Sequence, residues 1–301
     1  MDGRGPAGSR RRLGAELRRL RTKAGLHLDQ VAERVPCSTS KISRLETGKG
    51  SPKAADVQRL MDIYGVGSGA ESEMLLRLVR DSRGHGWWER YTDGVTPERF
   101  VLDDSNRYTA LEDDATAVRT FSIVAVHGLV QTAAYARAVI GALLPHHPAA
   151  EIEQLVTLRL KRQEALTRAV DPLRYSAVVD ESVLCRVVGG PEVMREQLQH
   201  LLRVVELPAV ELRILPFTAG MHRAHAGRFT ILEFPDAVGP PVVYVEGPAG
   251  DSYLEAEADV AVYQDVLADA AGRALDPAAS ADLVARYLHD LAPRARKATP
   301  P

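Results

Sequence analysis

The sequence predicts two domains of different fold class, an N-terminal all-α domain of five helices and a C-terminal α+β domain. Three observations predict this division. A length of 301 residues fits two domains of roughly 100–200 residues each. Apolar residues recur at helical spacing through residues 13–83, whereas later segments mix that spacing with strand-like alternation. The formal charge also changes sign between the two regions.

The charge difference is the first indication of function. Residues 1–83 hold 17 Lys and Arg against 10 Asp and Glu, a formal charge of +7, and the remaining residues hold 21 against 30, a charge of −9. A basic segment joined to an acidic one predicts that the basic segment meets a polyanion. The alternative is that the surfaces of the helices merely differ in charge, without a functional reason.

Composition excludes several other classes. Two cysteines are too few for a disulfide framework or a zinc finger. The arginines near the N-terminus precede no apolar stretch, so we expect no secretion signal. No apolar run approaches the ~20 residues that span a bilayer. We therefore expect a cytoplasmic protein, associated with the nucleoid when bound to DNA, with no membrane partner.

The five N-terminal helices follow from apolar spacing and end signals. Leu13, Leu17, Leu20 and Ala24 share one helix face, and Gly25 ends that helix. The others are predicted from Leu28 to Val35, from Thr39 to about Thr47, from Pro52 through Tyr64, and from Glu71 to Arg83. Residues 1–12 are expected to form a basic arm along the DNA minor groove, with a solvated tail as the alternative.

The second and third helices form a recognisable pair. The tight turn at residues 36–38 joins them, and Ser38 is a good N-cap. Ile42 and Leu45 are the only large apolar residues of the third helix and face inward together, which leaves small polar and basic side chains outward. A helix that enters the major groove needs such side chains. The sequence therefore predicts a helix-turn-helix.

Residues Leu26–Ala32 and Ser38–Lys49 resemble the XRE/Cro–repressor family of DNA-binding domains, over about residues 12–66. The resemblance implies roles by position. The side chains expected to face bases or adjacent phosphates are Thr39, Ser40, Lys41 and Arg44. Arg44 is the candidate for a bidentate contact to guanine. Ser43 and Lys49 are expected to contact the phosphate backbone.

The same resemblance implies a structural ion pair and one departure. Glu46 is expected to pair with Arg21, late in the first helix, so that replacing Glu46 would impair folding and binding together. His27 stands where these domains usually have Ser or Thr. Because His caps a helix poorly, we expect that helix end to fray, or His27 itself to contact a phosphate.

A new composition begins near Gly84. We predict a hinge and aromatic anchor over residues 84–100, an α+β regulatory and dimerisation domain over 101–293, and a tail over 294–301. Strands are predicted at 174–179, 210–215, 229–234 and 242–245. Helices are predicted at 131–144, 151–168, 181–187, 191–205, 255–273 and 279–292.

Several C-terminal stretches together resemble one actinobacterial regulator family, the WhiJ-like regulators, also described as antitoxin-like. These stretches are Trp87-Trp88, Leu111-Glu112, His127–Ala138, Asp180-Glu181, Val188–Gly190 and Tyr244–Glu246. His127 and Val130 replace the Pro and Leu that are usual there. The resemblance implies a transcriptional regulator whose C-terminal domain engages a small partner protein encoded nearby. The residues expected on a partner or ligand surface are Trp87, Trp88, Tyr91, Gln131, Thr132, Tyr135 and Arg137.

No enzyme signature is found. His146-His147 and the pair His222 and His225 lack the spacing of a zinc hydrolase helix, so we expect exposed loop histidines and no metal. Cys37 and Cys185 are expected to be buried and inert. No glycine-rich segment fits a phosphate loop or a dinucleotide fingerprint, so no cofactor is expected.

We therefore predict a sequence-specific DNA-binding regulator, a repressor, that acts as a homodimer on double-stranded DNA with pseudo-palindromic operators. One short helix contacts too few base pairs to specify a genomic site, so two copies are expected. The C-terminal domain would be controlled by a small partner protein. A small-molecule sensor with a ligand pocket near Trp87, Trp88 and Tyr91 is the main alternative, and an enzyme localised to DNA is a third.

Overall fold

The computed structural model describes residues 6–84, 86–95, 107–236, 238–247 and 250–295. These residues divide into two compact units. One holds helices α1 to α5 with α7 and the loop 234–240, and the other holds the sheet with α8 to α13. Parts of the predicted arm (1–5), hinge (85 and 96–100) and tail (296–301) lie outside the described residues.

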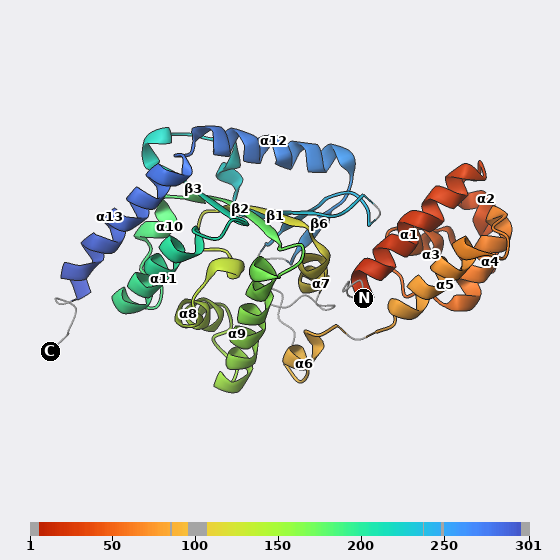
Figure 1. The fold of residues 1–301 in the computed structure, drawn as a ribbon, viewed down its shortest axis with the longest axis horizontal. Helices are drawn as coiled ribbons and strands as arrows, with labels where there is room; N and C mark the ends of the chain where they lie inside the picture. The colour runs from red at the N-terminus through yellow and green to blue at the C-terminus, as the bar shows by residue number, and fades with distance from the viewer. Residues whose placement is uncertain (1–5, 85, 96–106, 237, 248–249, 296–301) are drawn as a thin grey trace. The chain divides into compact units, whose positions relative to one another are not determined.

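The N-terminal unit is helical, as predicted (Figure 1). Its helices are α1 (Pro6–Lys23), α2 (Leu28–Ala32), α3 (Thr39–Glu46), α4 (Ala54–Tyr64), α5 (Ala70–Asp81) and α7 (Arg107–Asp114). The short helix α6 (Glu89–Thr92) follows the two tryptophans. The predicted helix bounds agree with these to within a few residues, apart from α7 and the beginning of α1.

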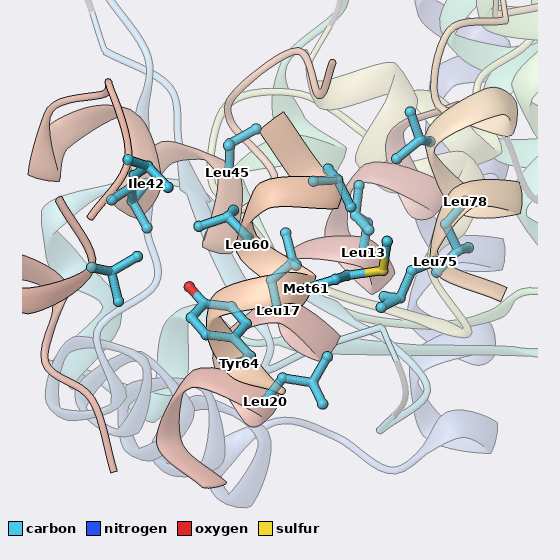
Figure 2. Close-up of a cluster of buried hydrophobic side chains, with 14 residues drawn as sticks. Leu13, Leu17, Leu20, Ile42, Leu45, Leu60, Met61, Tyr64, Leu75 and Leu78 are labelled. Carbon is cyan, nitrogen blue, oxygen red and sulfur yellow. The ribbon is translucent and has the colours of Figure 1, made fainter. Parts of the chain in front are cut away.

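Apolar side chains from α1 to α5 meet in one buried core (Figure 2). Leu13, Leu17 and Leu20 line one face of α1, as their spacing predicts. Ile42 and Leu45 of α3 enter the same core. Because these two side chains are fixed inside, the opposite face of α3 is held outward.

The beginning of α1 corrects the prediction of an extended basic arm. Residues 6–12 are already helical. Arg11 is buried, with its guanidinium 4.1 Å from the centre of the Phe234 ring and Nη2 donating to the Pro240 carbonyl at 2.8 Å. Arg10 donates to the Ser82 carbonyl at 3.1 Å, and burial lowers its pKa. These arginines therefore serve packing within the unit.

The second unit is a mixed sheet with helices on both faces, which confirms the α+β prediction. Among the described residues the strands are β1 (Ala117–Ser122), β2 (Arg174–Asp180), β3 (Val210–Leu215), β4 (Phe229–Glu233), β5 (Val242–Val245) and β6 (Ser252–Leu254). Their order is β3-β2-β1-β4-β5-β6. β1, β2 and β3 run parallel, and the remaining pairs are antiparallel.

Helical crossovers join the parallel strands. They consist of α8 (Ala133–Leu143) and α9 (Ala149–Gln163) after β1, and of α10 (Ser182–Cys185) and α11 (Pro191–Val204) after β2. The chain ends with α12 (Glu257–Arg273) and α13 (Pro277–Ala295). Figure 1 shows α12 on one face of the sheet and α8, α9 and α11 on the other. Within the described ranges, no helix combines the length and apolar character that crossing a bilayer requires.

Two apolar clusters lie in the second unit, one between the sheet and α12 and one between α8 and α9. Phe121, Phe229 and Val243 pack with Val260 and Leu267 of α12 on one side. Ala136 and Ile140 of α8 pack with Leu155 and Val156 of α9 in a second cluster.

Candidate nucleic-acid interface

The turn and cap before α3 are built as the sequence predicts. Ser38 has extended backbone angles, and its Oγ accepts a hydrogen bond from the Lys41 amide at 3.2 Å. This bond satisfies one of the free amides of the first helical turn. Ser40 and Arg44 lie on the exposed face of α3, and Thr39, Lys41 and Ser43 are partly exposed.

Arg44 is the side chain best prepared to meet DNA. It is exposed, and it forms no ion pair with any described residue. An unpaired guanidinium keeps its full set of donors for a base edge or a phosphate. Arg44 therefore combines the position and the chemistry that direct base readout requires.

Lys41, unlike Arg44, has an ion-pair partner within its own domain. Its ammonium forms an ion pair with Asp56 Oδ2 at 2.7 Å, and this contact raises the pKa of Lys41. Asp56 lies in the first turn of α4, where the helix dipole favours a carboxylate. Lys41 must share or leave that carboxylate before it contacts DNA. Thr39 is also engaged, because its hydroxyl donates to Asp29 Oδ1 at 3.3 Å.

A depression lies beside α3 and the loop that follows it. Its lining residues are Ser38, Ser40, Lys41, Arg44, Leu45, Gly50 and Ser51. Hydroxyl groups and two cations line this concave surface, and these groups commonly bind phosphate oxygens. Lys49 is exposed on the same loop.

The structure brings Arg21 and Glu46 together in a bidentate ion pair. Arg21 Nε donates to Glu46 Oε1 at 2.7 Å and Nη2 donates to Oε2 at 2.9 Å. Only 13% of the Arg21 side chain and 4% of the Glu46 side chain are exposed. Arg21 Nη1 also donates to the Leu26 carbonyl at 2.8 Å, and the carboxylate raises the pKa of Arg21. This pair joins α1, the end of α3 and the segment before α2.

His27 does not cap α2 with its side chain. Its backbone amide instead donates to Gln30 Oε1 at 2.8 Å, which supplies the reciprocal half of a capping box. The helix end therefore has a compensating contact that the sequence analysis did not foresee. The imidazole is exposed and is available to a phosphate.

Two glycines position α3 through a close approach of helices that the sequence does not predict. A Cβ built on Gly14 of α1 would lie 2.6 Å from the carbonyl oxygens of Leu45 and Glu46. Gly48, just after α3, has a φ of +69°, and a Cβ there would lie 2.9 Å from the Cα of Arg11. The absence of side chains at both positions lets α1 pack directly against the end of α3.

In the second unit, the predicted partner or ligand surface is corrected. Gln131, Thr132 and Tyr135 are buried. Gln131 Nε2 donates to the Val126 carbonyl at 2.6 Å, and Thr132 Oγ1 accepts from the Tyr135 amide at 3.2 Å as the N-cap of α8. Gln197 of α11 accepts from the Thr132 amide at 2.8 Å. These polar side chains satisfy the backbone of a turn and do not lie on a surface.

The aromatic residues of that predicted surface also differ in exposure. Trp88 is buried and meets Trp87 edge to face, with ring centres 5.8 Å apart. Trp87 and Tyr91 are partly exposed. Arg137 is exposed but forms an ion pair with Glu153. Of the predicted surface, only Trp87, Tyr91 and Arg137 therefore reach solvent.

Cysteine and histidine placement differs from expectation as well. Cys185 is exposed, and its thiol donates to the Tyr287 hydroxyl at 3.3 Å, whereas Cys37 is partly exposed. The side chains of His147 and His222 are largely buried. Among the described residues, no three His, Cys, Asp or Glu side chains are grouped so as to hold a metal ion.

Comparisons with known families give two matches. A family model described as a domain of unknown function (DUF5753) matches residues 105–286, and one described as a helix-turn-helix domain matches residues 12–75. The comparisons with curated proteins and with solved structures return no match. The helix-turn-helix match includes most of α1, all of α2 to α4 and part of α5, and it indicates a DNA-binding regulator.

Proposed function

The chain belongs to the family of the domain of unknown function DUF5753, and because a helix-turn-helix domain precedes that domain we propose that the protein is a sequence-specific transcriptional repressor. In this proposal residues 1–83 bind DNA and residues 101–293 regulate and dimerise the protein. The observation that carries it is the exposed face of α3, where Arg44 has no ion-pair partner among the described residues.

The contacts at α3 support a division of roles. Arg44 would read a guanine through two parallel hydrogen bonds. Ser40, Ser43, Lys49 and His27 would contact phosphates and fix the register of the helix on the duplex. Lys41 would bind a phosphate while it remains close to Asp56. The ion pair between Arg21 and Glu46 would hold α3 at the angle that these contacts need.

Replacing Arg44 by alanine is expected to weaken binding to a selected duplex by about 1–3 kcal/mol and to make one operator position degenerate. Fluorescence anisotropy on the selected duplex and on single-base variants of it measures both effects. Lys49→Ala is the matched control, because a lost phosphate contact weakens binding to all duplexes alike. Unchanged base preference in the Arg44 variant would remove this residue from base readout.

Two copies are expected to bind one operator. A helix of the length of α3 contacts only a few base pairs, and this is too little information to specify a genomic site. Two half-sites in inverted orientation, one helical turn apart, match a dimer with two-fold symmetry. The net charge of −9 outside residues 1–83 would repel DNA, so in each copy the contact is expected to be confined to residues 1–83.

Control by a small partner protein is supported by the resemblance to antitoxin-like regulators. The alternative is a small-molecule sensor, and Trp87 and Tyr91 remain the partly exposed aromatic residues for it. The two alternatives are distinguished by measuring which added effector releases the purified protein from the selected duplex. Release by a co-expressed neighbouring gene product favours the partner, release by a metabolite extract that has passed a small-pore filter favours the sensor, and turnover of a compound would favour an enzyme.

A further inference from the structure

The carboxyl ends of three parallel strands lie at one edge of the sheet, near α10 in Figure 1. Hydrogen bonds tie together the loops that leave these strands. Ser182 Oγ donates to the Ile123 carbonyl at 3.0 Å, which joins the loops after β1 and β2. The Glu181 amide donates to the Leu215 carbonyl at 2.9 Å, and Glu181 Oε2 accepts from the Phe217 amide at 2.7 Å. The three loops therefore form one continuous surface, called here the carboxyl-edge surface.

Large apolar side chains gather on the carboxyl-edge surface. Six such side chains are exposed among the described residues, and four of them lie in the connections that follow β1, β2 and β3, with Val187 just after α10. The four are Val124 (48% exposed), Val187 (42%), Phe217 (57%) and Met221 (73%). Scattered exposed apolar residues are ordinary, but a concentration at one edge indicates a contact surface.

Charges of both signs on this surface lack partners of opposite permanent charge. Asp180 and Glu181 form no ion pair with a lysine or arginine among the described residues. Asp180 Oδ2 lies 3.9 Å from His222 Nε2. Arg186 and Arg223 are exposed and form no ion pair within the described part of the chain. Asp269 accepts from the Arg223 amide but pairs with Arg273 at 3.0 Å.

The polar centre of the surface is fixed before any partner binds. Glu181 Oε1 accepts a hydrogen bond from the Tyr287 hydroxyl at 2.8 Å, and the same hydroxyl accepts from the Cys185 thiol. Asp180 Oδ1 accepts from the Ser182 amide at 2.9 Å. Side chains that are already ordered lose little entropy on association, which favours binding by this surface.

We propose that the carboxyl-edge surface is where two copies of this chain meet in a two-fold dimer. A two-fold interface brings the same patch of both copies together, so the patch must complement itself. Apolar side chains beside carboxylates and arginines that lack partners of opposite permanent charge meet that condition. A basic partner would offer opposite charge only to Asp180 and Glu181, whereas a second copy brings both carboxylates and arginines to the interface.

This inference rests on the proposed function and deepens it, because it names the surface that joins the two copies and so pairs their DNA-binding domains. Its test does not depend on DNA. Sedimentation equilibrium of the full chain is expected to give a dimer at micromolar concentration. The double variant Phe217→Glu, Met221→Glu is expected to raise the dissociation constant about 100-fold, since apolar anchors dominate such interfaces. The control is Val170→Glu, an equally drastic change at a side chain that is 77% exposed and precedes β2, at the other end of the parallel strands.

Thermal unfolding of each variant checks that the fold is intact, and Arg223→Glu supplies an independent charge test. Arg223→Glu is expected to weaken the dimer about 10-fold while leaving the fold unchanged. A monomeric wild type, or a double variant that dimerises as the wild type does, would overturn the proposal. Binding of wild type to a selected duplex is measured separately, so that failure of DNA binding is distinguished from failure of this dimer surface.

Discussion

Replacing Glu46 by alanine is expected to destabilise the N-terminal domain by about 3 kcal/mol and to abolish specific DNA binding at the same time. The change removes one partner of an ion pair that is nearly inaccessible to solvent, and it leaves the Arg21 guanidinium in place without its carboxylate. Loss of one partner from a buried pair costs roughly 3–5 kcal/mol. The lower end applies because 13% of the Arg21 side chain still reaches solvent.

Urea unfolding of wild type and variant, followed by circular dichroism, measures the loss of stability. The matched control is Glu71→Ala, which breaks the exposed ion pair between Glu71 and Arg19. An exposed pair contributes only about 0–1 kcal/mol, so this control is expected to unfold almost as wild type does. If Glu46→Ala unfolds at the wild-type urea concentration, the pair does not hold α3 against α1.

Replacing Gly14 by valine is expected to cost about 1–3 kcal/mol and to weaken DNA binding beyond what the loss of folded protein explains. The added Cβ would lie 2.6 Å from two backbone oxygens at the end of α3, and backbone cannot rotate away as a side chain does. The helices α1 and α3 must therefore separate. Since α3 carries the proposed DNA-binding face, we expect the orientation of that face to change with the packing.

The comparison uses a second glycine of the same unit. A Cβ added at Gly67 would meet no atom within 4 Å, and the φ of Gly67 is not positive, so Gly67→Val is expected to change stability by less than about 0.5 kcal/mol. Unfolding is measured as above, and binding is measured by anisotropy at a temperature where each variant is folded. Wild-type stability and affinity for Gly14→Val would mean that α1 and α3 do not pack as closely as described.

The N-terminal fold could be predicted from the sequence because its signals are local. Apolar spacing and the Ser38 cap predicted a third helix from Thr39 to about Thr47, and α3 extends from Thr39 to Glu46. Two strands with strongly apolar or alternating patterns, β3 and β5, have the bounds predicted for them. Short-range periodicity therefore sufficed wherever one face of an element is apolar and the other is not.

β1 was missed because both of its faces are buried and one carries polar side chains. Thr120 and Ser122 are buried, so the strand shows neither an apolar run nor a clean alternation. Without β1, the parallel half of the sheet and its carboxyl edge could not be foreseen. The sheet order depends on contacts between residues far apart in the chain, and the periodicity of a single segment contains no information on them.

The candidate interface shows the same limit. The outward position of Arg44 follows from helical spacing, whereas the contact of Lys41 with Asp56 joins residues of two helices. The close approach at Gly14 likewise depends on how two helices pack. The prediction of a surface at Gln131, Thr132 and Tyr135 was wrong because their polar groups bond to the backbone and to one another, which composition alone does not reveal.

The most direct test of the central claim, that the exposed face of α3 reads DNA sequence, is selection of binding sites from a random duplex pool by the full-length protein. We expect one short half-site, enriched in two inverted copies about one helical turn apart and containing at least one invariant guanine. The same selection with Arg44→Ala is expected to recover the half-site with that position degenerate. Recovery of no enriched sequence by the wild type would contradict the account.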